Sequence, residues 1–134
     1  MTTQKNMSDL KILVVEDQDD VRKMIKDMLE NMGVAKVFEA KDGQQAFEFI
    51  DAAFDFVDLI ICDWNMPELT GVELLRQIRA TDEKVPFLMV TGRMDMDSVV
   101  EAKNSGVTAY IAKPFSAVQL EAKIRVVLKG LQSS

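Results

Sequence analysis

Short apolar runs alternate with stretches of helical periodicity along the chain. The runs are rich in β-branched residues and lack an alternating polar face, which predicts strands buried on both faces of a parallel sheet. The stretches between them place apolar residues every three or four positions, which predicts amphipathic helices. The predicted strands cover residues 11–15, 34–40, 57–63, 86–90 and 108–112, and the predicted helices cover 21–32, 44–53, 71–80, 97–105 and 117–129.

Several residues between these elements are typical of helix ends. Asp19 or Asp20 is predicted to cap the first helix, and Ser116 is predicted to cap the last. Gly33 and Gly106 follow the first and fourth helices, where glycine commonly ends a helix. These residues support the helix limits that the apolar pattern gives.

The alternation of strands and helices predicts a single α/β domain. Parallel strands joined by short connections and helices form right-handed crossovers. The chain of 134 residues is long enough for one such layered core. We expect residues 1–8 to form a flexible tail and residues 9–131 to form the domain, a doubly wound parallel sheet.

Composition excludes several kinds of chemistry. The chain has no histidine and one cysteine, so it lacks imidazole metal sites, histidine-based catalysis and internal disulfides. Cys62 lies in a predicted buried strand and is interpreted as a core residue. The net charge of −6 argues against nucleic acid as a direct partner. No apolar run approaches the length of a membrane span, so we expect a cytoplasmic protein without a membrane partner.

Four of the predicted strands end on chemically distinctive residues. Glu16-Asp17 follow the first strand, Asp63 ends the third, Thr91 follows the fourth and Lys113 follows the fifth. Open α/β sheets bind ligands at the carboxyl ends of their strands, so these side chains are predicted to meet. Each residue alone has an ordinary interpretation as a turn, cap or surface residue. Together they indicate a site, with Asp63 expected to face solvent.

Converging carboxylates predict a divalent cation at this edge. Like charges a few ångströms apart repel one another unless a cation lies among them. Oxygen ligands favour Mg²⁺, Mn²⁺ or Ca²⁺, and Mg²⁺ leaves room for a phosphoryl oxygen. The Asp63 carboxylate can act as a nucleophile toward phosphorus, while the Lys113 ammonium and the Thr91 hydroxyl can stabilise phosphoryl charge. The set therefore predicts phosphoryl transfer to Asp63.

These motifs resemble those of a known family. Glu16-Asp17, the run Asp63-Trp64-Asn65-Met66-Pro67 with Gly71, Thr91-Gly92, Tyr110 and Lys113-Pro114-Phe115 are similar to the receiver domain of two-component response regulators. The resemblance covers about residues 9–130, the receiver domain, and implies a flavodoxin-like (βα)5 fold with strand order 2-1-3-4-5. Within the family it is greatest to stand-alone, CheY-like chemotaxis regulators.

The resemblance implies a metal site and a phosphorylation site that share one residue. Asp63 would be the phosphoacceptor. Asp17, Asp63 and the main-chain carbonyl of Asn65 would bind Mg²⁺ or Mn²⁺, with Glu16 acting through water. Glu16 replaces an aspartate of the nearest relatives, and its longer side chain is expected to reach a metal-bound water.

The resemblance also assigns residues around the phosphoryl group. Thr91 and Lys113 would hold phosphoryl oxygens, and Tyr110 would be an aromatic rotamer switch. Arg93 stands where the nearest relatives carry glutamate, so it would modulate the rate of dephosphorylation, as would Asn65. The Lys113-Pro114 bond is expected to be cis.

The family implies a signalling protein rather than an enzyme that acts on an external substrate. A CheA-like histidine kinase would donate the phosphoryl group. The phosphorylated form would bind a flagellar motor switch protein or another protein target through the face around residues 95–110 and the last helix. A phosphatase would be a further partner.

Three alternative functions remain open at this point. An Mg-dependent aspartate-nucleophile phosphohydrolase typically needs a second acid two residues after the nucleophile, where this chain has Asn65, and a cap domain. A phosphate-sink receiver would have no motor target. A flavodoxin-type electron carrier would need a phosphate-binding loop after the first strand, where this chain has two acids.

Overall fold

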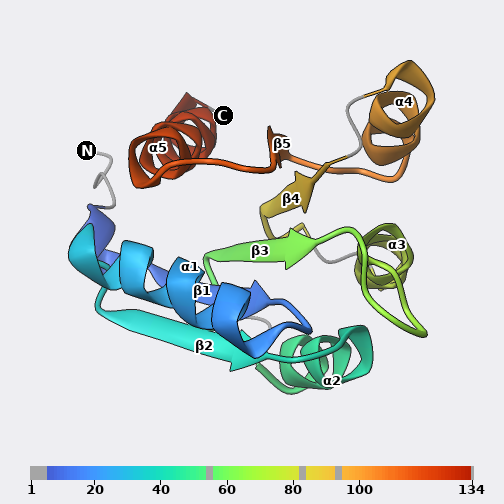
Figure 1. Cartoon of the computed structure of the whole chain (residues 1–134), viewed down its shortest axis with the longest axis horizontal. Helices are drawn as coiled ribbons and strands as arrows, with labels where there is room; N and C mark the ends of the chain where they lie inside the picture. The colour runs from blue at the N-terminus through green and yellow to red at the C-terminus, as the bar shows by residue number, and fades with distance from the viewer. Residues whose placement is uncertain (1–5, 54–55, 82–83, 93–94, 134) are drawn as a thin grey trace.

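Five parallel strands form one sheet in the order β2-β1-β3-β4-β5, the order that the resemblance implied (Figure 1). The computed structural model describes residues 6–53, 56–81, 84–92 and 95–133. The strands are β1 (Lys11–Val15), β2 (Lys36–Ala40), β3 (Leu59–Asp63), β4 (Phe87–Thr91) and β5 (Ala109–Ala112). The helices are the 3₁₀ helix η1 (Met7–Asp9) and the α-helices α1 (Asp19–Asn31), α2 (Gly43–Ala53), α3 (Gly71–Ala80), α4 (Met96–Asn104) and α5 (Ala117–Ser133).

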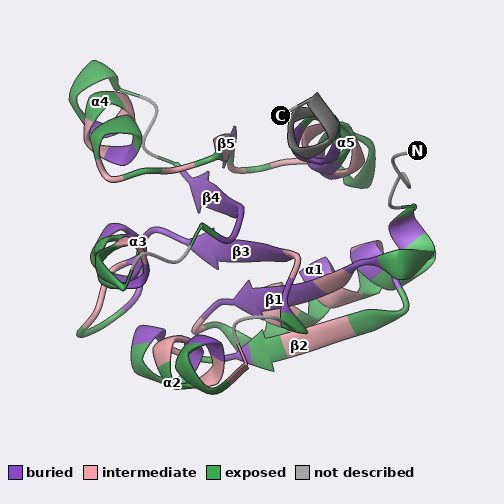
Figure 2. Ribbon diagram, turned by 180° about the vertical axis from the view of Figure 1, so that it is seen from behind, coloured by how far each residue is buried: buried purple, intermediate pink, exposed green. Residues whose placement is uncertain are grey.

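Helices cover both faces of the sheet. α1 and α5 pack on one face through residues such as Ile25 and Leu120, and α2, α3 and α4 pack on the other (Figure 1). The central strands β1, β3 and β4 are buried along almost their whole length, whereas the edge strand β2 is partly exposed (Figure 2). Cys62 is buried in β3, as predicted. No helix in the described ranges is long and apolar enough to cross a membrane.

Glycine ends α1 and α4 in the same way. Gly33 and Gly106 have φ angles of +98° and +96°, which glycine adopts without steric cost. The Gly33 N–H donates to the Glu30 carbonyl at 3.0 Å, and the Val34 N–H donates to the Leu29 carbonyl at 3.1 Å. The Val34 N–H thus takes part in the cap that follows α1, and β2 begins at Lys36 instead of at residue 34 as the pattern predicted.

The start of α1 differs from the prediction. Gln18 is its N-cap, in an extended conformation and without a side-chain cap hydrogen bond. Asp19 and Asp20 lie in the first turn, where carboxylates interact favourably with the helix dipole. The Asp19 carboxylate instead accepts a hydrogen bond from Arg22 at 2.6 Å. Asp19 thus pairs with Arg22, one turn later in α1, and does not act as the predicted N-cap.

The N-terminal segment and the start of α5 compare differently with the predictions. Met7, in the predicted tail, is 7 % exposed and joins the core cluster between the sheet and α1 and α5. Ser116 caps α5 as predicted, since its Oγ accepts the Gln119 N–H at 3.1 Å. Val118 is 79 % exposed because it lies on the opposite side of α5 from the buried Leu120.

The loop between β3 and α3 folds back onto the strand end, and this requires glycine at position 71. The Gly71 N–H donates to the Trp64 carbonyl at 2.9 Å. A Cβ at this position would collide with the Asp63 main-chain oxygen and lie 2.9 Å from Trp64 Cα. Backbone atoms cannot rotate away as a flexible side chain can.

We therefore expect Gly71→Ala to lower the free energy of unfolding by about 2 kcal/mol or more, as overpacking commonly does. Urea unfolding followed by circular dichroism measures this. Gly92→Ala is the matched control, since a Cβ there meets no atom of the described residues within 4 Å. Equal stability of the two variants would contradict the steric argument.

Candidate functional site

The strand register brings the acidic residues to one edge of the sheet. Val15 at the end of β1 pairs with Cys62 of β3. Glu16, the next residue after Val15, therefore stands level with Asp63. Its N–H donates to the Ala40 carbonyl at the end of β2, at 3.1 Å. The backbone of the neighbouring strands thus places the two carboxylates side by side.

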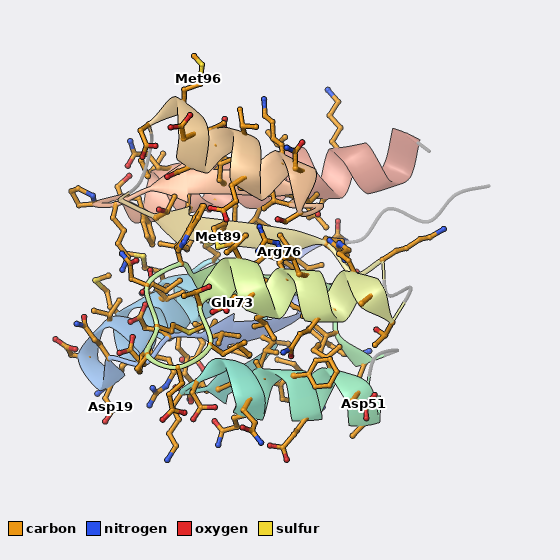
Figure 3. The ribbon with its side chains drawn as sticks, turned by 90° about the vertical axis from the view of Figure 1, so that its right-hand side faces the viewer. Asp19, Asp51, Glu73, Arg76, Met89 and Met96 are labelled. Carbon is orange, nitrogen blue, oxygen red and sulfur yellow. The ribbon has the colours of Figure 1, made fainter. Side chains whose placement is uncertain are left out.

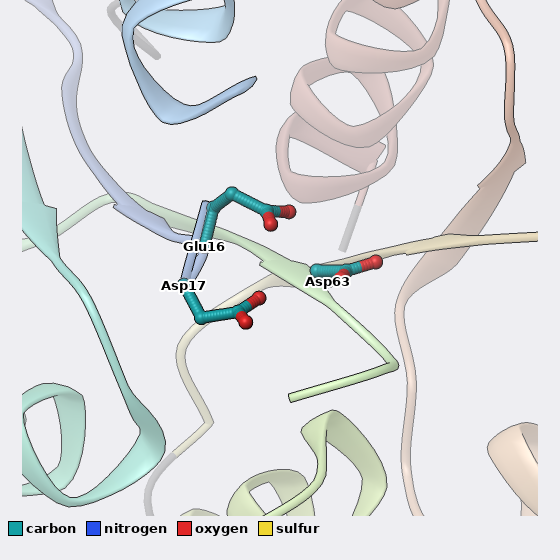
Figure 4. Close-up of side chains that lie close together, drawn as sticks. All are labelled: Glu16, Asp17 and Asp63. Carbon is teal, nitrogen blue, oxygen red and sulfur yellow. The ribbon is translucent and has the colours of Figure 1, made fainter. Parts of the chain in front are cut away.

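Three carboxylates share a small volume. One oxygen from each of Glu16, Asp17 and Asp63 lies within 4.8 Å of the others, and their carboxyl groups converge (Figure 4). Glu16 is 1 % exposed and Asp63 is 4 % exposed, while Asp17 is half-buried. The expectation that Asp63 faces solvent is therefore wrong. Glu16 and Lys113, carried on the segments after β1 and β5, cover its carboxylate.

Among the described residues, one side-chain cation pairs with the carboxylates of this cluster. Lys113 Nζ lies 2.9 Å from Asp63 Oδ1 and 3.9 Å from Glu16 Oε2. The Lys113 main chain is anchored by its own N–H, which donates to the Thr91 carbonyl at 2.9 Å. The Lys113-Pro114 bond is cis, as expected. Lys113 carries one positive charge, so it cannot balance three carboxylates.

Burial and repulsion act together on Glu16. Burial first, and the negative charge of Asp63 second, raise the pKa of the Glu16 carboxyl from 4.5 to about 7. The Gln18 N–H, which donates to Glu16 Oε1 at 3.1 Å, and the Lys113 ammonium oppose this rise in pKa without cancelling it. The site thus holds more negative charge than the described residues neutralise.

The donor set fits a hard divalent cation. Glu16 Oε2 and Asp63 Oδ1 are buried and accept no hydrogen bond from the described residues, although Lys113 pairs electrostatically with both. Buried carboxylate oxygens normally have such partners, so these two are available as ligands. Three carboxylates with no nitrogen or sulfur donor suit Mg²⁺ or Mn²⁺.

The other predicted site residues lie on the loop after β3 and on the strands β4 and β5. Asn65 is exposed in the loop two residues after Asp63. Thr91 is 2 % exposed at the end of β4, one residue beyond Val90, which pairs with Asp63. Tyr110 lies in β5, where it pairs with Met89, and its ring is near Lys123 of α5. Arg93 lies outside the described residues.

Arg22 contacts the main chain of this site but is not among the predicted site residues. Arg22, in the first turns of α1, donates to the Glu16 main-chain oxygen at 2.8 Å. A single arginine in a helix carries no distinctive sequence signal. Arg22 follows Asp19 by three residues, and residues three apart are neighbours on a helix. This spacing indicates an ion pair with Asp19 but gives no sign of the bond to Glu16.

We predict that Glu16 makes the stability of the cation-free protein fall as the pH rises. The folded pKa of about 7 exceeds the unfolded value of 4.5. The stabilisation that the bound proton gives is therefore fully present below pH 4.5. It is lost as the pH rises from 4.5 through 7. Between pH 5 and 8, wild type should lose about 2 kcal/mol more free energy of unfolding than Glu16→Gln.

Urea unfolding in chelator at several pH values measures this difference. Glu48→Gln is the control, because Glu48 is exposed on α2 and should leave the pH dependence of wild type unchanged. Parallel pH profiles for wild type and Glu16→Gln would show that the Glu16 carboxyl is not destabilised in the folded site.

Comparison with known proteins places the chain in a family. The response regulator receiver domain matches residues 12–125. Chemotaxis protein CheY of Pseudomonas aeruginosa is 39 % identical over 123 residues, covering 90 % of this chain and 97 % of that protein. CheY1 of Helicobacter pylori is 39 % identical over 121 residues, covering 89 % and 97 %. The solved structure of Vibrio cholerae CheY4 aligns with a TM-score of 0.81 at 32 % identity, covering 88 % of this chain and 98 % of that one. The chain therefore belongs to the response regulator receiver domain family.

Proposed function

We propose that the chain is a phosphorylation-driven switch in which Asp63 accepts a phosphoryl group from a histidine kinase. The observation that carries this proposal is the placement of Asp63. Its carboxylate lies between two further carboxylates and the Lys113 ammonium at the end of the central strand β3. This arrangement combines a nucleophile, cation ligands and a counter-charge for a phosphoryl group.

The proposed transfer is a single displacement at phosphorus. An Asp63 carboxylate oxygen forms a P–O bond as the P–N bond of the phosphohistidine breaks, and the departing imidazole takes a proton from solvent. Asp17, Asp63 and the Asn65 carbonyl would hold a divalent cation, with Glu16 acting through a water, and this cation would supply positive charge to the phosphoryl oxygens. Lys113, whose ammonium lies 2.9 Å from Asp63 Oδ1, is placed to donate one of its three N–H groups to a phosphoryl oxygen.

The signal leaves the site through β4 and β5. Thr91 moves its hydroxyl toward a phosphoryl oxygen, and Tyr110 turns into the space that this movement opens. Tyr110 lines a groove of about 480 Å³ with Ala122, Lys123 and Val126 of α5. Lys123 Nζ lies 5.8 Å from the centre of the Tyr110 ring. Turning Tyr110 would therefore reshape one wall of this groove.

The groove and α4 form the proposed partner surface. Val126 is 64 % exposed, and Met96 and Val100 of α4 are 79 % and 47 % exposed. Figure 3 shows Met96 projecting from α4 away from the rest of the molecule. Apolar side chains beside a groove suit an amphipathic partner helix. Because the relatives are named as chemotaxis proteins, we propose a flagellar motor switch protein as the target.

Asp63→Asn is expected to abolish phosphorylation while preserving the fold. The amide is nearly the same size but cannot act as the nucleophile. A small phosphodonor with Mg²⁺ should label wild type with one phosphoryl group that hydroxylamine removes, measured by intact-protein mass spectrometry. Asp51→Asn, on the exposed face of α2, is the control and should be labelled like wild type. Normal labelling of Asp63→Asn would place the acceptor elsewhere.

Thr91→Ala is expected to allow phosphorylation but to weaken the gain in partner affinity that phosphorylation causes. Asp63 should still accept the phosphoryl group, but the phosphorylation-dependent gain in affinity for a motor switch peptide should fall by about tenfold or more. Fluorescence anisotropy of the labelled peptide measures the gain.

Two variants sharpen this test. Thr91→Ser keeps the hydroxyl and should keep most of the affinity gain. Thr108→Ala removes a threonine hydroxyl just before β5, where it accepts the Phe87 N–H at 2.9 Å, and should leave the gain unchanged. A full gain in Thr91→Ala would rule out the route through Thr91.

A further inference from the structure

The Arg22 side chain joins three elements around the acidic pair Glu16-Asp17. Its Nη1 donates to the Glu16 main-chain oxygen at 2.8 Å, and its Nη2 donates to Asp19 Oδ1 at 2.6 Å. Its Nε donates to Glu39 Oε1 of the edge strand β2 at 3.3 Å. One guanidinium therefore connects the segment after β1 with α1 and with β2.

The contact with Glu16 differs in kind from the two ion pairs. The Asp19 side chain is 87 % exposed and that of Glu39 is 37 % exposed, and exposed ion pairs contribute little to stability. The Arg22 side chain is 16 % exposed, and its bond to the Glu16 carbonyl is part-buried and charge-assisted. The two carboxylates orient the guanidinium, which in turn holds the carbonyl.

Holding this carbonyl fixes the direction of Asp17. The Glu16 carbonyl and the Asp17 N–H belong to one planar peptide group, so the plane cannot turn without breaking the bond to Arg22. The other side of Glu16 is held by its N–H on the Ala40 carbonyl. Glu16 and Asp17 precede α1 and lie outside any strand. These bonds therefore fix their backbone, whereas the backbone of Asp63 is fixed by its place in the sheet.

We propose that Arg22 is a positioning residue that keeps Glu16 and Asp17 in place to bind a divalent cation together with Asp63. This inference rests on the proposed function, because it assigns the cation to the same three carboxylates. Mutual repulsion of these carboxylates drives the acidic segment away from Asp63, and the Arg22 bond to the backbone opposes that movement. Arg22 acts through the peptide group and does not contact the cation.

The shape of the guanidinium is essential to this role. Its planar fork presents donors in several fixed directions, so it reaches three acceptors at once. Lysine at position 22 would keep the charge and the attraction to Asp19 and Glu39, but its compact ammonium could not reproduce this fork. Arg22→Lys therefore separates positioning from charge.

The test compares Mg²⁺ binding by the full chain and its variants, using isothermal titration calorimetry. We expect Arg22→Lys and Arg22→Ala each to bind Mg²⁺ about tenfold more weakly, the usual effect of removing a group that orients a metal ligand. We expect Arg22→Lys to recover most of the thermal stability that Arg22→Ala loses. A purely structural role would restore affinity and stability together.

Lys26→Ala is the matched control on the same helix. Lys26 Nζ also pairs with Glu39, at 3.5 Å, and is one turn further from the acidic segment. Its removal takes away one positive charge and should leave Mg²⁺ affinity within about twofold of wild type, well below the effect of Arg22. Equal weakening by Lys26→Ala and Arg22→Ala would overturn the proposal, as would wild-type affinity in Arg22→Lys.

Hydrogen exchange of the cation-free protein gives a second readout that does not depend on the proposed function. The Gln18 N–H donates to Glu16 Oε1 and reports directly on the order of this segment. Its exchange should be faster in Arg22→Lys than in wild type and unchanged in Lys26→Ala. If wild type bound no Mg²⁺, the cation site would fail while this exchange still tested the positioning. Unchanged exchange in Arg22→Lys would overturn the proposal.

Discussion

The repulsion among three carboxylates is the constraint on which the rest of this structure depends. Glu16, Asp17 and Asp63 come within 4.8 Å of one another, and two of them are almost fully buried. Lys113 is the described cation in contact with them, at 2.9 Å from Asp63. A cluster with this excess of negative charge favours the binding of a cation, which would also offset the repulsion between the carboxylates and an anionic phosphoryl donor. The fold therefore assembles the cluster against an electrostatic cost, which a bound cation would lower.

The backbone, more than side-chain packing, holds the carboxylates against this repulsion. Asp63 ends a strand buried on both faces, and the loop that follows is fastened by the Gly71 N–H on the Trp64 carbonyl. Glu16 is held by the Ala40 carbonyl on one side and by Arg22 on the other. Each of these bonds acts at the main chain, so the side chains remain free to serve as ligands. In this position, burial first and the negative charge of Asp63 second raise the pKa of the Glu16 carboxyl.

The edge that carries the acidic cluster and the proposed partner surface share one pair of strands. β4 ends on Thr91, whose carbonyl accepts the Lys113 N–H, and β5 carries Tyr110 beside the groove on α5. On the other side of β4, Arg76 and Arg79 of α3 bind the end of α4 and the turn after it, through Glu101 and the Gly106 carbonyl. α4 is thus tied to a helix that begins next to the site. In the proposed function, a change at Asp63 would reach the proposed partner surface through β4 and β5.

The sequence by itself determined the element order, the sheet type and the residues at the strand ends. Strand burial and helix periodicity are local patterns, and Gly33, Gly106 and Ser116 end or begin helices through bonds to residues nearby in the chain. The resemblance supplied the strand order. The tertiary structure alone decided that Asp63 is buried, because Glu16 and Lys113 arrive from distant segments. It also decided that Asp19 pairs with Arg22 instead of capping α1, that Met7 enters the core, and that Arg22 holds the Glu16 carbonyl. These outcomes depend on contacts that form only when the chain has folded, and a local pattern of residue types along the chain does not specify such contacts.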